Sequence, residues 1–98
     1  MSSRTGLKSD GYDSAYAASK LAIRRFVESI AQEVKQDNIN VNCILLGIID
    51  TETTRKSMPK ADFSEWVQKE DLANVILFLC TEEAKVINGA AIQTYGLS

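Results

Sequence analysis

The sequence predicts an α/β fold built on a parallel sheet, and two observations lead to this class. Apolar residues recur with a helical period over residues 14–36 and again over residues 69–83. A short, largely apolar run follows each helical segment, over residues 39–47 and 90–96. The order helix, strand, excursion, helix, strand is typical of a parallel sheet in which helices connect successive strands.

The first helix is predicted to carry its apolar residues on one face, with charged residues between them. Asp13 or Ser14 is placed to cap its amino terminus. Asp37 and Asn38 then form a turn into the first strand, where polar and apolar residues alternate until the run becomes wholly apolar and ends at Gly47. We expect this strand to be buried.

Residues 51–66 show no sustained period and contain the only proline, Pro59, so we expect an excursion with one short helix. Excursions of this length inside compact domains tend to be lids or binding loops. The second helix has acidic residues in its first turn, where the helix dipole favours them. Asn88 and Gly89 are predicted to form a turn into the last strand.

Composition excludes several classes of protein. The 98 residues, 45% hydrophobic and 24% charged, indicate one soluble globular domain. A net charge of -2 with mixed signs along the chain predicts no nucleic-acid partner. No apolar run is long enough to cross a bilayer and the amino terminus is polar, so we expect a cytoplasmic protein without a membrane partner.

The chain contains no histidine, which removes histidine-based triads and the commonest transition-metal ligand. Acid-base chemistry must then use tyrosine, lysine or carboxylates, and we expect no metal site. Cys43 and Cys80 lie in apolar surroundings without a metal-like spacing, and we expect both to be buried, reduced thiols.

Only two strands are clear in this sequence, and the first becomes apolar on both faces. A strand of that kind normally has neighbours on both sides, and an apolar edge without a partner favours association. We therefore expect the chain to form part of a larger sheet, completed by self-association or by another chain.

Tyr16 and Lys20 lie four residues apart, on one face of the first predicted helix. A nearby ammonium stabilises a phenolate and lowers the pKa of a phenol, which can then exchange a proton with a carbonyl or alcohol oxygen. The spacing alone is weak evidence, because with three tyrosines and several lysines it arises by chance about one time in five. The pair is either a proton-transfer device or two ordinary surface side chains.

Three segments of the chain bear on that choice: SSRTGLKSDGYDSAYAASKLA at residues 2–22, INVNCILLGIIDT at 39–51, and KEDLANVILFLCTEEAKVINGAAIQTYG at 69–96. They resemble the active-site segment, the loop that closes over the nicotinamide, and the last helix and strand of the short-chain dehydrogenase/reductase family. The resemblance covers nearly the whole chain in the right order. The stretch IDTETTRKSMPKADFSEW, residues 49–66, is similar to dihydropteridine reductases within that family.

The resemblance implies the carboxyl-terminal half of a Rossmann-like, doubly wound parallel sheet, with two strands, two main helices and a loop excursion. It divides this single partial domain into a catalytic segment at residues 1–36, a nicotinamide-side strand and loop at 37–66, and a final helix and strand at 67–98. It also implies NAD or NADP as cofactor, and a small-molecule carbonyl or pteridine-like substrate.

Site residues follow from the resemblance by position. Tyr16 corresponds to the general acid/base, and Lys20 to the residue that lowers the phenol pKa and binds the nicotinamide ribose. Ser3 corresponds to the serine that hydrogen-bonds the substrate oxygen. The cofactor-binding positions on the nicotinamide-side loop are Gly47, Ile49 and Thr51. From the residues alone, Ser3 also fits a turn and Thr51 a helix cap, while Tyr12 fits a surface or pocket-rim aromatic.

The chain departs from the family pattern at three places. Leu46 and Gly47 stand where Pro-Gly is usual, which predicts a less rigid loop. The end reads TYGLS in place of an Asp-Gly-Gly pattern. No two of the five glycines lie close enough for the glycine-rich turn that binds a pyrophosphate.

Three hypotheses remain open at this point. The chain is the catalytic half of an NAD(P)-dependent oxidoreductase, truncated and inactive alone, whose amino-terminal half is supplied elsewhere. Alternatively it is a non-catalytic interaction or oligomerisation module derived from such an enzyme. A third reading is an α/β domain without a ligand. The first two predict a homo-oligomer or a complex with an amino-terminal half.

Overall fold

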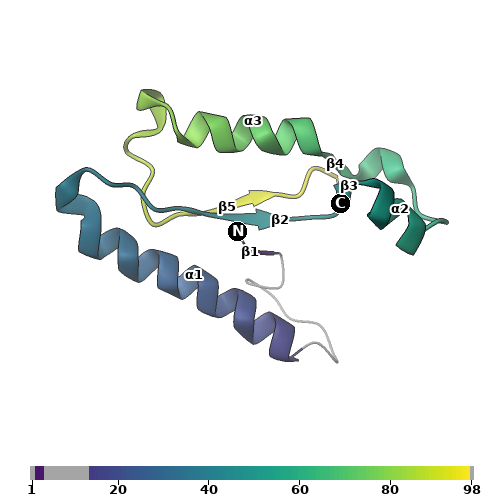
Figure 1. Ribbon diagram of the computed structural model, residues 1–98, viewed down its shortest axis with the longest axis horizontal. Coiled ribbons are helices and arrows are strands. Elements are labelled where there is room, and N and C mark those ends of the chain that lie inside the picture. The colour runs from purple at the N-terminus through teal and green to yellow at the C-terminus, as the bar shows by residue number, and fades with distance from the viewer. Residues whose placement is uncertain (1, 4–13, 98) are drawn as a thin grey trace.

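The computed structural model describes residues 2–3 and 14–97, and in this part of the chain the expected α/β arrangement is confirmed. Three parallel strands, β1 (Ser2–Ser3), β2 (Cys43–Leu46) and β5 (Ala91–Thr94), form a sheet in the order β1-β2-β5. Helix α1 (Ser14–Val34) lies on one side of this sheet and α3 (Lys69–Leu79) on the other (Figure 1). The arrangement is a sheet between two helical layers.

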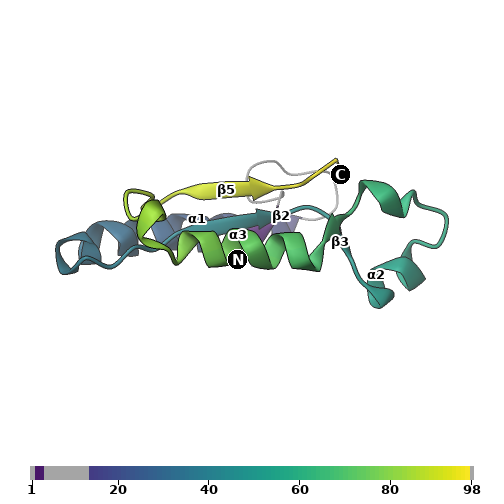
Figure 2. The ribbon, with the colours of Figure 1, turned by 90° about the horizontal axis from the view of Figure 1, so that it is seen from above.

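A second, smaller element leaves the end of this sheet. Strands β3 (Ile49–Asp50) and β4 (Val67–Gln68) pair in parallel, and α2 (Glu52–Ser57) and the 3-10 turn η3 (Phe63–Glu65) lie between them. Figure 2 shows this segment extending beyond the strands of the main sheet. The excursion predicted for residues 51–66 is therefore confirmed, and it contains a 3-10 turn in addition to the one short helix expected.

The helix boundaries follow the predicted periods closely at their amino ends and end earlier at their carboxyl ends. Helix α1 gives way to the 3-10 turn η2 (Lys35–Asp37), and α3 stops at Leu79 before a second turn, η4 (Glu82–Ala84). Asn38 closes η2 in the left-handed conformation, with φ of 59°. The turn predicted at Asn88 and Gly89 is confirmed, because Gly89 has φ of 69°, which a glycine adopts at little cost.

The prediction of two strands was incomplete. β1, β3 and β4 are each two residues long, too short to leave a periodic pattern in the sequence. Of the strand predicted over residues 39–47, only residues 43–46 belong to the sheet, and Ile39 is 49% exposed. Before Cys43 the chain is held by one backbone bond, from the Gly89 amide to the Val41 carbonyl, and by asparagine side chains, since Asn40 and Asn42 donate to the carbonyls of Lys85 and Ile87.

The buried core is small and centred on β2. Leu45 is fully buried and its neighbours Cys43 and Ile44 are nearly so. β2 is apolar on both faces because helices cover both sides of the sheet. In the part of the chain whose burial is described, the other buried hydrophobic residues are Ala17, Ala31, Trp66 and Ala84.

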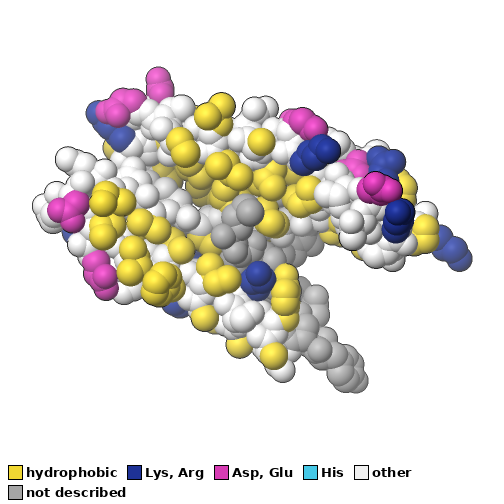
Figure 3. All heavy atoms as spheres, in the orientation of Figure 1, with side chains coloured by type: hydrophobic (Ala, Val, Ile, Leu, Met, Phe, Trp, Pro, Cys, Tyr) yellow, Lys and Arg dark blue, Asp and Glu magenta, His cyan; other side chains and the backbone are white. Residues whose placement is uncertain are grey.

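The prediction that both cysteines are buried was wrong for Cys80, which is exposed. Helix α3 has no buried residue among those described, and Leu77 and Phe78 are 66% and 48% exposed. Figure 3 shows hydrophobic side chains gathered along the hollow between α3 and α1. On the apolar face expected of α3, Leu72, Val75 and Leu79 are half-buried and Ile76 is 40% exposed, so within the described chain this face is only partly covered.

Candidate functional site

The predicted site residues gather at the carboxyl end of the sheet. Parallel pairing places Ser3 opposite Leu46, so β1 and β2 end side by side immediately before Gly47. Figure 1 shows the first turns of α1 at the same end of the molecule as the segment that follows β2. In open parallel sheets, ligands bind outside the carboxyl ends of the strands. The topology thus brings the two predicted groups of site residues to the expected edge.

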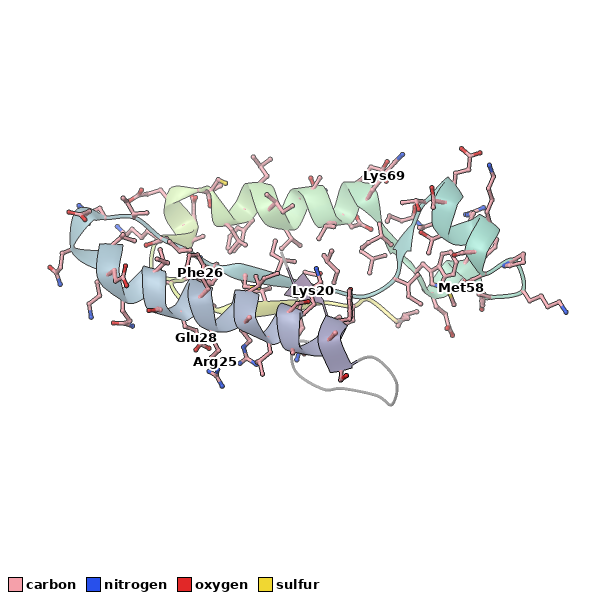
Figure 4. The ribbon with its side chains drawn as sticks, turned by 60° about the horizontal axis from the view of Figure 1, so that its bottom comes forward. Lys20, Arg25, Phe26, Glu28, Met58 and Lys69 are labelled. Atoms are coloured by element: carbon pink, nitrogen blue, oxygen red, sulfur yellow. The ribbon has the colours of Figure 1, made fainter. Side chains whose placement is uncertain are left out.

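Tyr16 and Lys20 lie on the first two turns of α1, one above the other. The Lys20 ammonium stands 5.4 Å from the centroid of the Tyr16 ring, within the range of a cation–π contact. Tyr16 is 51% exposed and Lys20 is half-buried. Figure 4 shows Lys20 and Arg25 projecting from different sides of α1. The pairing predicted from the spacing is present.

The structure describes the backbone of Ser3 and not its side chain, so the predicted substrate contact lies outside the described part of the molecule. Tyr12 also lies outside the described residues. The described backbone of Ser3 lies opposite Leu46, at the end of the strand pair that leads to Gly47.

The loop after β2 is fixed by backbone pairing. The Val67 amide donates to the Ile48 carbonyl at 2.9 Å, and Ile49 lies opposite Val67 in the β3–β4 pair. Gly47, Ile48 and Ile49 are all half-buried. The less rigid loop predicted from the missing proline is thus held by a partner strand that local sequence does not reveal.

Thr51 caps helix α2. Its side-chain oxygen accepts a hydrogen bond from the Thr54 amide at 3.1 Å, and it shares a second hydrogen bond with the Thr54 hydroxyl at 2.5 Å. When Thr54 is the donor in that second bond, the Thr51 proton is left to donate elsewhere. The helix-cap interpretation of Thr51 is confirmed. In that arrangement the Thr51 hydroxyl can cap α2 and still donate one hydrogen bond to another group.

Asp50, between the two predicted loop residues, was missed by sequence reasoning. Its carboxylate accepts two hydrogen bonds from Arg55, at 2.6 and 2.8 Å, and one from the Gln68 amide at 3.0 Å. Arg55 first and Gln68 second hold the pKa of Asp50 at about 2, below its usual 3.8. An aspartate at the end of an apolar run, with an arginine five residues later, is the signal that could have suggested it.

An aromatic pair continues this network. The Arg55 guanidinium lies 4.6 Å from the centroid of Phe63, and the Phe63 and Trp66 rings are 4.8 Å apart with an interplanar angle of 45°. Trp66 is only 6% exposed. The excursion therefore has a small packed centre of its own.

A mostly apolar cavity of about 360 Å³ lies between α3, β4, β5 and the carboxyl-terminal residues. None of the predicted site residues lines it. Its apolar wall was not foreseen because its residues come from separate elements, and it includes Trp66, Val67, Leu72, Val75, Ile92 and Leu97.

Two further properties concern the described residues. They contain no group of three or more histidine, cysteine, aspartate or glutamate side chains arranged to hold a metal ion. None of their helices is long and apolar enough to span a membrane.

Comparison with known proteins gives consistent results. A family model described as Enoyl-(Acyl carrier protein) reductase matches residues 1–96. The 3-oxoacyl-(acyl-carrier-protein) reductase FabG of Chlamydia trachomatis serovar D is 33% identical over 105 residues, covering 98% of this chain and 42% of that protein. The acetoacetyl-CoA reductase of Paracoccus denitrificans is 30% identical over 102 residues, covering 95% of this chain and 42% of that protein.

Solved structures agree in fold. A mutant of 4-hydroxyisoleucine dehydrogenase complexed with NADH and succinate has a TM-score of 0.85 and 27% identity, over 99% of this chain and 44% of that one. L-Sorbose reductase from Gluconobacter frateurii, complexed with NADPH and L-sorbose, has a TM-score of 0.82 and 29% identity, over 97% and 44%. The chain spans less than half the length of the relatives it matches.

Proposed function

The chain belongs to the short-chain dehydrogenase/reductase family, and we propose that it supplies the acid-base and nicotinamide-side part of an NAD(P)-dependent oxidoreductase. The observation that carries the proposal is the Tyr16–Lys20 pair, with the ammonium 5.4 Å from the ring centroid, at the carboxyl end of a parallel sheet. The named relatives include a 3-oxoacyl reductase and an L-sorbose reductase, whose names denote carbonyl substrates.

The donor set fits the nicotinamide half of such a cofactor. The exposed Tyr16 side chain and the Lys20 ammonium offer hydrogen-bond donors at one end of α1. Thr51 retains a proton to donate when Thr54 donates to it. The half-buried backbone from Gly47 to Ile49 provides a wall at the same end of the sheet. When bound, the nicotinamide supplies the hydride that is exchanged with the substrate carbon.

In this proposal Tyr16 moves the proton. During reduction its hydroxyl donates to the substrate oxygen as negative charge develops there, and during oxidation it accepts the proton back. Lys20 stabilises the phenolate that forms, because an ammonium beside a developing anion lowers its energy. Ser3 hydrogen-bonds the same substrate oxygen and so fixes the direction of proton transfer.

The loop residues have a binding role. We assign Gly47, Ile49 and Thr51 to the nicotinamide side of the cofactor, with Thr51 contributing a hydroxyl and Ile49 backbone groups. Residues 37–66 then form the nicotinamide-side segment, between the catalytic segment at 1–36 and the final helix and strand at 67–98. Either a carbonyl or a pteridine-like substrate is compatible with this arrangement.

The pyrophosphate contacts must come from elsewhere in this scheme. The five glycines in the sequence do not form the G-x-G-x-x-G pattern of a pyrophosphate-binding turn. We propose that these contacts are made outside the 98 residues, and that the chain alone is inactive. Apolar residues are left exposed on α3 and along the hollow of Figure 3. Their exposure favours the presence of a second protein surface that covers them.

The proposal is tested by titrating NADH fluorescence against the chain, alone and in the assembly that binds the cofactor, with the native mass measured in parallel. In that assembly we expect Tyr16→Phe to lower kcat about 100-fold or more with NADH binding retained. Lys20→Ala is expected to weaken NADH binding and lower kcat together. Lys35→Ala is the matched control, because it removes a lysine just beyond the other end of α1.

Two results would contradict the proposal. One is a Tyr16→Phe variant with unchanged kcat in an assembly that binds NADH. The other is a Lys20→Ala variant that behaves like Lys35→Ala in both NADH affinity and turnover.

A non-catalytic interaction module is the second candidate, and exposed apolar residues favour it. Phe26 on α1 and Leu77 on α3 are 67% and 66% exposed, on opposite sides of the sheet. A module of this kind would self-associate or join a full-length relative through these faces. It predicts an oligomer by sedimentation that binds no NADH in any assembly, whereas the catalytic proposal predicts NADH binding lost on Lys20→Ala.

A further inference from the structure

The excursion between β3 and β4 is closed by very little backbone pairing. Its two arms share a parallel ladder of two residues each, with Ile49 opposite Val67 and Asp50 opposite Gln68. So short a ladder contributes few hydrogen bonds and is weak by itself. The side chains at its end therefore decide whether the arms stay together.

Asp50 is the residue on which those side chains converge. Its carboxylate accepts from Gln68 across the ladder, at 3.0 Å, and from the two arms of the Arg55 fork on α2, at 2.6 and 2.8 Å. The Asp50 side chain is only 8% exposed, although the Arg55 side chain is 51% exposed. One carboxylate thus joins β3, α2 and β4.

The network reaches the packed centre of the excursion through Arg55. Its guanidinium contacts the Phe63 ring at 4.6 Å, and Phe63 contacts the buried Trp66 at 4.8 Å. Arginine can bind a carboxylate bidentately and stack on an aromatic ring at once, which lysine cannot do. Release of the carboxylate would therefore also loosen the orientation of Phe63.

We propose that Asp50 is a positioning residue that holds the nicotinamide-side loop in place, by tying Ile49 and Thr51 on either side of it to α2 and β4. This inference rests on the proposed function of those two residues. Asp50 need not touch the cofactor, because a shift of about 1 Å in a positioned group is enough to impair catalysis.

A neighbouring ion pair shows what sets Asp50 apart. Glu52 and Lys56 on α2 make a single contact of 3.1 Å, and their side chains are 84% and 76% exposed. Such exposed pairs contribute little, whereas a bidentate pair with a shielded carboxylate and a third hydrogen bond is geometrically fixed. Glu52→Gln is therefore the matched control for Asp50→Asn, since each replaces a carboxylate by an isosteric amide.

The first measurement is limited trypsin digestion of the chain, followed by mass spectrometry of cleavage after Arg55, Lys56 and Lys60. Cleavage of a transiently opened loop reports the population of the open form. We expect Asp50→Asn to raise the rate of cleavage in the excursion about tenfold, because it removes hydrogen bonds to a charged group. Glu52→Gln is expected to stay within about twofold of the unchanged protein.

The second measurement separates positioning from general damage. In the cofactor-binding assembly, Asp50→Asn is expected to raise the Kd for NADH about tenfold, and Asp50→Glu, which keeps the carboxylate, to restore part of that loss. Arg55→Lys keeps the charge and loses the fork, so it should fall between Asp50→Asn and the unchanged protein.

Each outcome decides a separate question. Equal cleavage of Asp50→Asn and Glu52→Gln would overturn the role of Asp50 in holding the loop. Faster cleavage with unchanged NADH affinity would overturn its positioning role and leave the proposed function standing. An unchanged protein that binds no NADH in any assembly would overturn the proposed function, while the cleavage comparison still decides whether Asp50 holds the loop.

Discussion

Replacing Asn42 by alanine tests how the two long strands of the sheet are joined. The Asn42 side chain donates to the Ile87 carbonyl at 2.9 Å and accepts from the Ala90 amide at 3.0 Å. Both bonds connect the residue just before β2 to the segment just before β5. They lie beside the backbone bond from Cys43 to Ala90, at 2.8 Å, which starts the β2–β5 ladder.

The magnitude follows from the two groups that lose their partner. Asn42→Ala leaves the Ile87 carbonyl and the Ala90 amide without this partner in partly buried surroundings, at a cost of about 1 kcal/mol each, the low end for buried polar groups. We therefore expect a loss of about 2 kcal/mol in the free energy of unfolding. With a urea m-value of about 1 to 2 kcal/mol/M, the midpoint falls by about 1 to 2 M.

The assay is urea unfolding followed by the emission of Trp66, the single tryptophan, which is 6% exposed. Asn40→Ala is the control, because Asn40 makes one exposed hydrogen bond, to the Lys85 carbonyl, and should cost less than about 0.5 kcal/mol. Equal midpoints for Asn42→Ala and Asn40→Ala would refute the reasoning.

Three further predictions concern the core and the excursion. Leu45→Ala removes a fully buried side chain from the middle strand and should lower the free energy of unfolding by about 3 kcal/mol, measured by thermal unfolding. A decrease no larger than that caused by Leu97→Ala, at an 81% exposed position, would contradict this prediction. Thr51→Ala should destabilise α2 by about 1 kcal/mol and speed exchange of the Thr54 amide, whereas Thr51→Ser should not; equal exchange in both variants would show that the hydroxyl is not the cap. Arg55 and Gln68, helped by the charges of Arg55 and Lys69, lower the pKa of Asp50 from 3.8 to about 2, so its stabilising contribution is complete above pH 4 and is lost as the pH falls toward 2. A carboxyl NMR titration of Asp50 with a midpoint near 3.8 would disprove this.

Much of the fold could be predicted from local pattern because its main elements are periodic. Apolar residues at helical spacing predict both long helices. A largely apolar run predicts β2, which both helical layers cover in the structure. The turn at Gly89 was readable because a left-handed φ selects glycine. The Tyr16–Lys20 pair was readable for a similar reason, since the helix pitch alone brings residues four apart together.

Other features depend on residues far apart in the chain. The two-residue strands exist only because a partner strand pairs with them, and the asparagine bonds of Asn42 join residues 45 and 48 positions apart. The convergence of Arg55 and Gln68 on Asp50 spans separations of 5 and 18. No period in the sequence records contacts of this kind.

The sequence by itself determined the helices, the buried strand, the tyrosine–lysine pair and the family resemblance. Each of these depends on the identity and spacing of residues that are close together in the chain. Only the tertiary structure decided that Asp50 joins three elements of the loop and that Cys80 is exposed. Those properties are set by which surfaces meet once the chain has folded. Burial and hydrogen-bond partners are shared between distant segments and cannot be read from either segment alone.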